Sequence, residues 1–355
     1  VSGANERHMV MTYDIDDVPH PPGATDDRLR GMLLGVAIGD ALGNTTESLN
    51  PEQRRESHGE VTDYLPNRWA DDMPVGVPSD DTQLTFWTVE SLLERGHIDP
   101  EDLLDRFSNE DIFGPGHGVE RAVEAYQYGS NWKDAGEPSG GNGALMRIAP
   151  VVLPHLPTGG RQLWEDVVFA TMITHSDEMA VVASVGFTGL LYELFGATPD
   201  EPSGEWWVDH FVKYARPVES GETYPSRSPH VDFEGTLCDM VERHMRRAAE
   251  GYISVVDACN TWYSGAYLFE TVPSALLILA RHGNDPEEAI IRAVNDTRDN
   301  DTIAAVVGAA VGALHGASAF PKRWVENLTG RTRKDDDGHV FELIDDAIDT
   351  FGLEQ

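Results

Sequence analysis

A strongly apolar helical pattern in the last fifth of the chain constrains the fold more than any other feature. Its apolar residues recur at intervals of three and four and share one helix face: Ile303, Val306, Val307, Ala310, Val311 and Leu314. Beside them, glycines recur every fourth residue, which lets another backbone approach closely: Gly308, Gly312 and Gly316. The apolar run ends at His315 and Pro321 and is too short to span a bilayer. We therefore predict a central, buried helix.

Other segments predict a mainly α-helical chain around it. Leu29, Met32, Leu33 and Val36 follow helical spacing behind a cap at Thr25 or Asp26, and further helices are expected at 81–93, 144–148 and 166–183. Loops rich in Gly, Pro and Asp separate them at 48–80, 109–118, 129–142 and 215–232, while alternating strands are scarce and no repeat is visible. The prediction is an all-α, compact single-domain orthogonal helical bundle over residues 26–355. Residues 1–25 are expected to form a loose tail.

Composition limits the possible partners. The chain has 355 residues, and its 61 Asp plus Glu against 26 Lys plus Arg give a formal charge of −35, which disfavours general nucleic-acid binding. A solvated acidic surface explains this charge more simply than metal storage does. Two cysteines, Cys238 and Cys259, cannot build a disulfide framework, and no signal peptide or spanning segment is evident. We expect a protein of the cytoplasm, with no membrane partner.

Three segments combine small residues with carboxylates at the end or start of an apolar helix. They are Gly39-Asp40-Ala41-Leu42-Gly43 with Glu47, Ser79-Asp80-Asp81-Thr82, and Asp299-Asn300-Asp301-Thr302. A single acidic pair before a helix is usually a cap. Repeated clusters of hard oxygen ligands suit Mg²⁺, Mn²⁺ or Ca²⁺ better than zinc. Two such clusters could hold two ions.

These segments resemble a known family. Residues 35–47, 79–85, 141–150, 174–180 and 299–313 follow the order seen in ADP-ribosylglycohydrolases, including the similar dinitrogenase reductase-activating enzymes and ADP-ribosylarginine hydrolases. The resemblance implies an all-α fold in which loops and helix N-termini form a cleft for two Mg²⁺, with Mn²⁺ possible, at the mouth of an ADP-ribose site. Carried over by position, it assigns as metal ligands Ser79 (more often Thr), Asp80, Asp81, Asp299, Asp301 and Thr302.

The resemblance also implies residues that act on the substrate. Glu47, Asp80 and Asp299 are the catalytic candidates, and the sequence does not choose the general base among them and Asp81. The expected substrate contacts are Asp40, Gly141, Asn142, Gly143, Met146, His175, Tyr267 and Arg298. The glycine loop at 140–143 suits backbone approach to phosphate or ribose, although a plain turn fits it too. His175 and Tyr267 fit core positions as well.

One position departs from the family pattern. Where relatives often carry Gly-Gly before the last Asp-x-Asp, this chain has Thr297-Arg298, so Arg298 could narrow the cleft, contact a diphosphate or pair with Asp296. The implied activity is metal-dependent hydrolysis of the N- or O-glycosidic bond between ADP-ribose and a modified target, and the expected target is ADP-ribosyl-arginine. The alternatives are a catalytically silent ADP-ribose-binding or structural protein on the same scaffold, and a two-metal hydrolase of a phosphoester.

Overall fold

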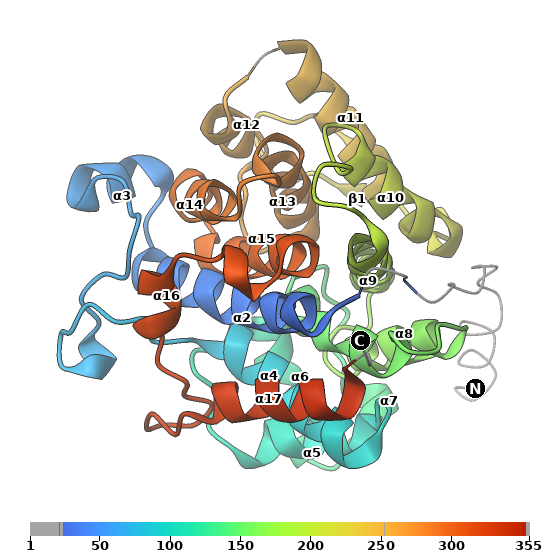
Figure 1. The fold of residues 1–355 in the computed structure, drawn as a ribbon. Coiled ribbons are helices and arrows are strands. Elements are labelled where there is room, and N and C mark those ends of the chain that lie inside the picture. Colours follow the sequence, from blue (N-terminus) through green and yellow to red (C-terminus); the bar gives the residue numbers. More distant parts are fainter. Residues whose placement is uncertain (1–20, 22–23, 252, 353–355) are drawn as a thin grey trace.

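The computed structural model describes residues 21, 24–251 and 253–352, and it confirms the predicted all-α class (Figure 1). The predicted tail at 1–25 lies, apart from residues 21, 24 and 25, outside the described residues. The described α-helices are α2 (Asp26–Gly43), α3 (Pro51–His58), α4 (Asp80–Arg95), α5 (Pro100–Asn109), α6 (His117–Gln127), α7 (Trp132–Ala135), α8 (Gln162–Met172), α9 (Glu178–Gly196), α10 (Trp206–Ala215), α11 (Leu237–Gly251), α12 (Val255–Trp262), α13 (Leu268–His282), α14 (Pro286–Asp296), α15 (Asn300–His315), α16 (Lys322–Glu326) and α17 (His339–Phe351).

Short elements fill the connections between these helices. The 3₁₀ turns are η1 (Asn44–Thr46), η2 (Arg68–Ala70), η3 (Leu145–Arg147), η4 (Ala149–His155), η5 (Arg216–Val218) and η6 (Ala317–Ala319). The described strands, β1 (Tyr224–Pro225) and β2 (Glu234–Gly235), form one small antiparallel pair. Thus the scarcity of strands that the sequence indicated is confirmed in the described residues.

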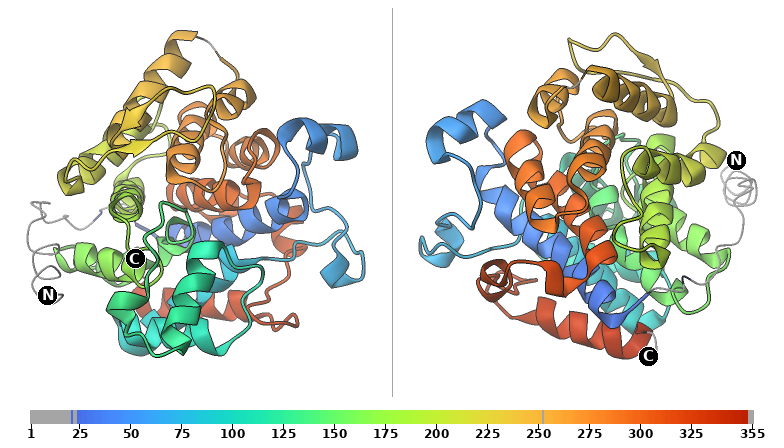
Figure 2. Two further views of the ribbon diagram at one scale, coloured as in Figure 1. Left: turned by 180° about the vertical axis from the view of Figure 1, so that it is seen from behind. Right: turned by 45° about the horizontal axis from the view of Figure 1, so that its top comes forward.

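Helices α2 and α15, from opposite ends of the chain, lie side by side at the centre of the molecule (Figures 1 and 2). The backbone that approaches the glycines of α15 is that of α2, which carries its own glycines at four-residue spacing: Gly31, Gly35, Gly39 and Gly43. A Cβ built on Gly35 would collide with the carbonyl of Gly308, and one built on Gly308 would collide with the carbonyl of Gly35. The two helices therefore touch through their backbones, with no room for side chains between them.

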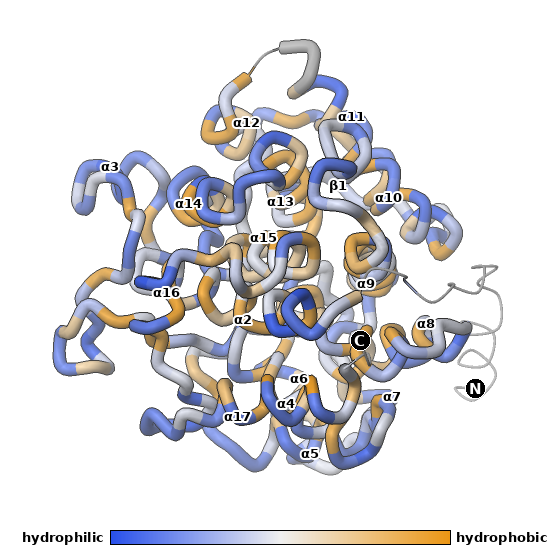
Figure 3. The backbone as a smooth tube through the Cα atoms, in the orientation of Figure 1, coloured by the Kyte–Doolittle hydropathy of each residue, from blue (hydrophilic) through white to orange (hydrophobic). Residues whose placement is uncertain are grey.

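The remaining helices wrap this central pair. Helices α13 and α14 pack on one side of it, α9 continues the core and contacts α10, and α4 packs with α5 and α17 on the other side. Blue, hydrophilic colouring dominates α3 and the outer turns, whereas orange gathers toward the centre in Figure 3. Helix α9 is long and apolar enough to span a membrane, contrary to the sequence expectation, but 89% of its apolar window is buried inside the protein. Such burial is typical of a core helix.

Some predicted boundaries are wrong. The helix predicted at 166–183 is two helices, α8 and α9, separated by residues 173–177, which carry Thr174 and His175. The helix predicted at 144–148 is the 3₁₀ turn η3, continued by η4. The predicted loops at 48–80 and 129–142 contain α3 and α7, because Asn50 and Asn131 provide side-chain caps for these short helices. Thr25, as expected, caps α2 by accepting a hydrogen bond from the Arg28 amide.

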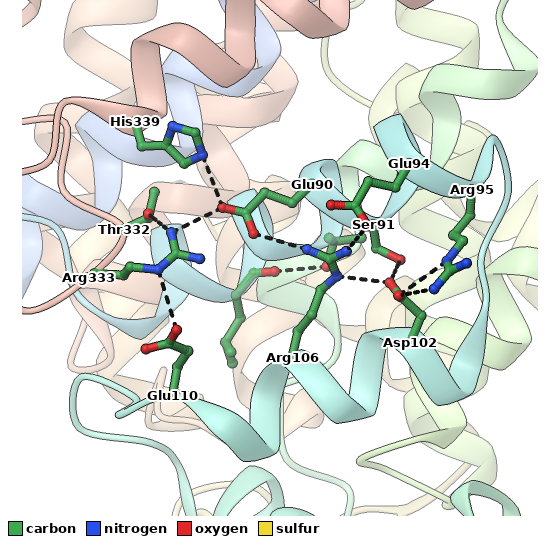
Figure 4. A network of polar contacts seen from close by, with 12 residues as sticks. Glu90, Ser91, Glu94, Arg95, Asp102, Arg106, Glu110, Thr332, Arg333 and His339 are labelled. Carbon is green, nitrogen blue, oxygen red and sulfur yellow. Dashed lines mark hydrogen bonds and ion pairs between the residues drawn. The ribbon is translucent and has the colours of Figure 1, made fainter.

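A polar network fastens α4 to its neighbours (Figure 4). Arg106 of α5 pairs with Glu90 and Glu94 of α4 and with Asp102, while Arg333 and His339 reach Glu90 from the C-terminal part of the chain. Although burial alone would raise the pKa of Asp102, hydrogen bonds from Arg106, Arg95 and Ser91 lower it to about 2. These ion pairs fix the outer face of α4, whose N-terminus carries the Ser79-Asp80-Asp81 segment.

Adding a single methyl group at the central contact should destabilise the protein. Alanine is the better helix former by about 1 kcal/mol, yet Gly35→Ala places a Cβ against the Gly308 carbonyl, so we expect a net loss of about 3 kcal/mol from overpacking. The measurement is the free energy of unfolding in urea. Gly116→Ala is the control, because a Cβ there meets nothing within 4 Å and its φ is −61°. Equal stability of the two variants would contradict a tight backbone contact.

Candidate metal centre and ligand cleft

A cavity of about 650 Å³ opens where the N-termini of α4, α6 and α15 meet the loops before η3 and α13. Among the predicted site residues, those that line it are Glu47, Asp80, Asp81, Gly141, Asn142, Gly143, Met146, His175, Tyr267, Asp299, Asp301 and Thr302. Predicted site residues that are far apart in the sequence thus line one cavity. Ser79, Asp40 and Arg298 do not line it.

Three buried carboxylates, each from a different helix, form the first acidic cluster. Oxygen atoms of Asp40 (α2), Asp81 (α4) and Asp301 (α15) lie within 4.8 Å of one another. Oδ1 of Asp81 is buried and has no hydrogen-bond partner. Burial, together with the neighbouring carboxylates, raises the pKa of Asp81 and of Asp301 well above the usual value. Such concentrated negative charge, with an unsatisfied oxygen ligand, is the environment that a divalent cation would stabilise.

A second cluster shares a residue with the first. Oxygen atoms of Glu47, Asp299 and Asp301 also lie within 4.8 Å of one another, and Glu47 is exposed whereas Asp301 is buried. Burial raises the pKa of Asp299 to about 6, partly offset by a 2.5 Å hydrogen bond from Asn142 Nδ2. Burial and the Asp40 charge also raise the pKa of Glu47. Because Asp301 belongs to both groups, the arrangement fits two neighbouring cations that share one carboxylate.

The capping explanation for the acid clusters does not fit the contacts. Asp299 occupies the N-cap position of α15 and Ser79 that of α4, but neither side chain makes a capping hydrogen bond to its helix. In α9 and α14, by contrast, Asp177 and Asp285 do cap. N-capping of α4 and α15 by Ser79 and Asp299 therefore does not explain these acidic segments.

Asp40 has a different position from the one expected. It was predicted to contact substrate, but in the structure it is fully buried, does not line the cavity, and accepts hydrogen bonds from the amides and hydroxyls of Ser79 and Thr82. Its oxygens orient the start of α4 from the neighbouring helix and complete the first acidic cluster. The Ser79 hydroxyl, a predicted metal ligand, donates to Asp40 Oδ1 at 2.6 Å. Thr82, which the sequence analysis named in this segment without a role of its own, holds Asp40 as Ser79 does.

The glycine loop at 140–143 is more than a plain turn. Asn142 Nδ2 donates to both Thr271 Oγ1 and Asp299 Oδ2, and its amide donates to the Ala266 carbonyl. Gly141 forms an isolated antiparallel bridge with Tyr267. Asn142 thus connects Thr271 of α13 to Asp299 of the second acidic cluster. The loop lies between the metal ligands and the aromatic wall.

His175 closes the cavity from the α8–α9 connection. It is 2% exposed, and its Nδ1 lies 2.9 Å from Thr174 Oγ1, which also accepts a hydrogen bond from Arg147. Burial, with a smaller contribution from the Arg147 charge, lowers the pKa of His175 to about 3. The imidazole is therefore neutral at physiological pH and cannot act as a cationic ligand for phosphate.

Two aromatic side chains that line the cavity carry arginines on their faces. The Arg227 guanidinium lies 3.9 Å from the Tyr267 ring centroid, and that of Arg298 lies 4.3 Å from Tyr263. Arg298, which was predicted to contact substrate, does not line the cavity itself but stacks on Tyr263, which does. The alternative ion pair with Asp296 is not formed either, since Asp296 pairs with Arg292. Tyr267, in contrast, lines the cavity as predicted.

Sequence reasoning missed two groups of cavity residues. Glu270, in the first turn of α13, is 4% exposed and accepts a hydrogen bond from the Gly265 amide. The other group comes from loops and the start of α6: Gly114, Gly116, His117, Gly118, Val119, Ser139, Arg227, Pro229, Tyr263 and Ala266. The only sequence signal for Glu270 was a carboxylate in an apolar helix start, the same signal that identified the acid clusters. The 114–119 glycines looked like an ordinary loop.

Fold and site together define an all-α protein whose cleft is built from hard oxygen ligands. The chain belongs to the ADP-ribosylglycohydrolase family, whose profile matches residues 21–354. It is similar to ADP-ribosylarginine hydrolase Tri1 of Pseudomonas putida (strain GB-1), with 27% identity over 91% of this chain and 78% of the relative. ADP-ribosyl-[dinitrogen reductase] glycohydrolase of Rhodospirillum rubrum is 24% identical over 90% of this chain and 96% of its own length.

A solved structure shows the same architecture. It is described as an ADP-ribosylglycohydrolase-related protein complex, and it superposes with a TM-score of 0.66 at 27% identity, covering 92% of this chain and 97% of that one. The family resemblance inferred from five ordered segments is therefore confirmed, and it supports glycosidic-bond hydrolysis on ADP-ribosylated substrates.

Metal binding and stability should be linked through Asp301. Without a divalent cation, Asp301→Asn removes repulsion within both clusters, so we expect this variant to melt at a higher temperature than the unaltered protein in chelator. With Mg²⁺ at 100 times its Kd, the unaltered protein should gain about 2.7 kcal/mol and the order should reverse. Thermal denaturation with and without Mg²⁺ measures both effects.

Asp349→Asn serves as the control for this experiment, because Asp349 is an exposed carboxylate of α17. It should leave the Mg²⁺-dependent rise in melting temperature unchanged. A Mg²⁺ effect that Asp301→Asn retains in full would remove Asp301 from the ligand set.

Glu270 should make stability pH-dependent. Burial, partly offset by the Gly265 amide and Arg227, raises the pKa of Glu270 from 4.5 to about 7. The folded state therefore keeps a proton that the unfolded chain has already lost, and this contribution to stability disappears as pH rises from about 5 to above 7. Glu270→Gln should thus gain in melting temperature relative to the unaltered protein across pH 5–8. Exposed Glu326→Gln is the control, and a pH-independent difference for Glu270→Gln would contradict the raised pKa.

Proposed function

We propose that this chain is a Mg²⁺-dependent hydrolase that releases ADP-ribose from ADP-ribosylated arginine side chains. The observation that carries the proposal is the pair of acidic clusters joined at Asp301 on the floor of a 650 Å³ cavity. A silent binding protein has no need for two such clusters, whose buried carboxylates oppose folding when no cation is bound. The name of the Pseudomonas putida relative, an ADP-ribosylarginine hydrolase, supports the choice of linkage.

The donor set fits two Mg²⁺, with Mn²⁺ as the alternative, because every candidate ligand is a carboxylate or hydroxyl oxygen. Asp40, Asp81 and Asp301 would hold one ion, and Glu47, Asp299 and Asp301 the other, with Ser79 and Thr302 hydroxyls close to them in sequence. When bound, the cations would supply positive charge that orients ribose hydroxyls and promotes ionisation of water.

The chain's own residues would do the rest of the work. The Gly141–Gly143 backbone, His175 and Tyr267, all of which line the cavity, would bind the ligand. Asn142, by donating to Asp299, would hold that carboxylate in place. Glu47 is the exposed carboxylate of the second cluster, so it is best placed to exchange a proton with water during the reaction.

Arginine as the leaving group agrees with the electrostatics. Glu47, Asp80 and Asp299 line the same part of the cavity, and the whole chain carries a formal charge of −35. Negative potential attracts the cationic guanidinium of the leaving group. The proposed partner is therefore an ADP-ribosylated protein or small molecule with a cationic linkage.

The test is release of free ADP-ribose from arginine-linked and serine-linked peptides, with Mg²⁺ and with chelator. We expect release from the arginine-linked peptide only when Mg²⁺ is present, and a roughly 100-fold lower kcat for Glu47→Gln, in the range typical of a lost general base. Glu52→Gln, an exposed carboxylate of α3, is the matched control and should retain full activity.

Each contrary result has a distinct meaning. Release in chelator would exclude the metal-dependent reaction. Preferred release from the serine-linked peptide would mean that the enzyme cleaves a serine linkage and not an arginine linkage. ADP-ribose binding with no release from either peptide would favour the silent binding protein.

A further inference from the structure

Arg147 is a buried charge that the proposed reaction does not use. It is 0% exposed, its Nε and Nη1 have no hydrogen-bond partner, and its plane lies 5.1 Å from the Phe107 ring centroid. In the described part of the chain its side chain makes one hydrogen bond, from Nη2 to Thr174 Oγ1 at 2.6 Å. Buried guanidinium groups normally pair with a carboxylate. The hydrogen bond to Thr174 is therefore the contact through which Arg147 can act on its surroundings.

The Thr174 hydroxyl transmits this contact to His175. Thr174 is fully buried, and the described hydrogen bonds of its Oγ1 involve Arg147 Nη2 and His175 Nδ1, the latter at 2.9 Å. Arginine can only donate, so Oγ1 accepts on that side. If His175 Nδ1 also donated to Oγ1, the hydroxyl hydrogen would be buried without an acceptor. All groups are satisfied when the hydroxyl donates to an unprotonated Nδ1, which leaves the hydrogen of the imidazole on Nε2.

Nε2 of His175 faces the part of the cavity that glycines keep open. A Cβ on Gly118 would lie 2.6 Å from Nε2, and one on Gly143 would lie 2.9 Å from Cε1. Gly141 is the third glycine beside this edge of the ring, since a Cβ on it would lie 3.5 Å from Nε2. In the described residues no protein acceptor is hydrogen-bonded to Nε2, and His175 lines the cavity. Nε2 of His175 can thus donate a hydrogen bond to an acceptor on a ligand bound in the cavity.

We propose that Arg147 and Thr174 are positioning residues that fix His175 as the neutral Nε2–H tautomer, so that it donates one hydrogen bond to an oxygen of bound ADP-ribose. The identity of that ligand rests on the proposed function, whereas the tautomer follows from the Arg147–Thr174–His175 contacts alone. A fixed donor discriminates for an oxygen acceptor and against a ligand that presents a donor or a cation at this point. Arg147 acts through Thr174 and does not itself touch the cavity.

The tautomer is read directly by long-range ¹H–¹⁵N correlation on protein labelled with ¹⁵N-histidine at pH 7. We expect the His175 signals, assigned by their loss in His175→Gln, to show a hydrogen on Nε2 and none on Nδ1. Thr174→Val removes the hydroxyl, so signals of the Nδ1–H form should appear and the Kd for ADP-ribose in Mg²⁺, measured by calorimetry, should rise about tenfold. Thr174→Ser keeps the hydroxyl and should restore both readouts to within twofold.

The outcomes separate this inference from the proposed function. A hydrogen on Nδ1 in the unaltered protein would overturn the inference, even if ADP-ribose binds and arginine linkages are cleaved, and this spectrum is informative even if Thr174→Val does not fold. Unchanged tautomer and affinity in a folded Thr174→Val would also overturn it. An Nε2–H signal without ADP-ribose binding would support the tautomer and count against the proposed function instead.

Discussion

The backbone contact between α2 and α15 fixes the relative positions of the carboxylates that these two helices contribute to the site. Glycines at matching four-residue intervals let the two helices touch through main-chain atoms, with Gly35 against Gly308 and Gly31 against Gly312. This contact extends to the site, because a Cβ on Gly43 would lie 2.5 Å from the backbone of Asp301. Asp40 and Asp301 can therefore share one cluster although 260 residues separate them in the sequence.

Around that contact the protein concentrates negative charge at two helix N-termini. The positive ends of α4 and α15 partly offset the carboxylates there. The amides and hydroxyls of Ser79 and Thr82 offset more of the charge by donating to Asp40. Asp81 Oδ1, however, is left without a partner. The cluster is thus preorganised for a cation but not neutralised by the protein, which is the condition for selective metal binding at a rigid site.

How far the sequence predicted this arrangement depends on whether the signal was local. The apolar stripe of α15, the Thr25 cap and the acid clusters are local patterns, and each is where the sequence placed it. The position of Asp40 was missed, because its partners at 79 and 82 come from a helix far along the chain. The stacking of Arg298 on Tyr263 was not predicted for the same reason, since the two residues are 35 positions apart in the sequence. The matching glycines of α2 were readable at four-residue spacing, but only the partner helix explains them.

Thr297-Arg298, which replaces the Gly-Gly pair common in the family, is explained by the contacts of Arg298 with the loop at Tyr263 and Ser264. Tyr263 and Ser264 adopt positive φ angles of 88° and 48°, which residues other than glycine rarely adopt. The Ser264 carbonyl accepts hydrogen bonds from the amides of Arg298 and Asp299, and the Arg298 guanidinium covers the Tyr263 ring. A Gly-Gly pair could supply the amides but not the stacking. The strained aromatic loop and the metal-ligand candidate Asp299 therefore form one hydrogen-bonded unit, so that in this chain the rim of the cleft and its acidic floor cannot shift independently.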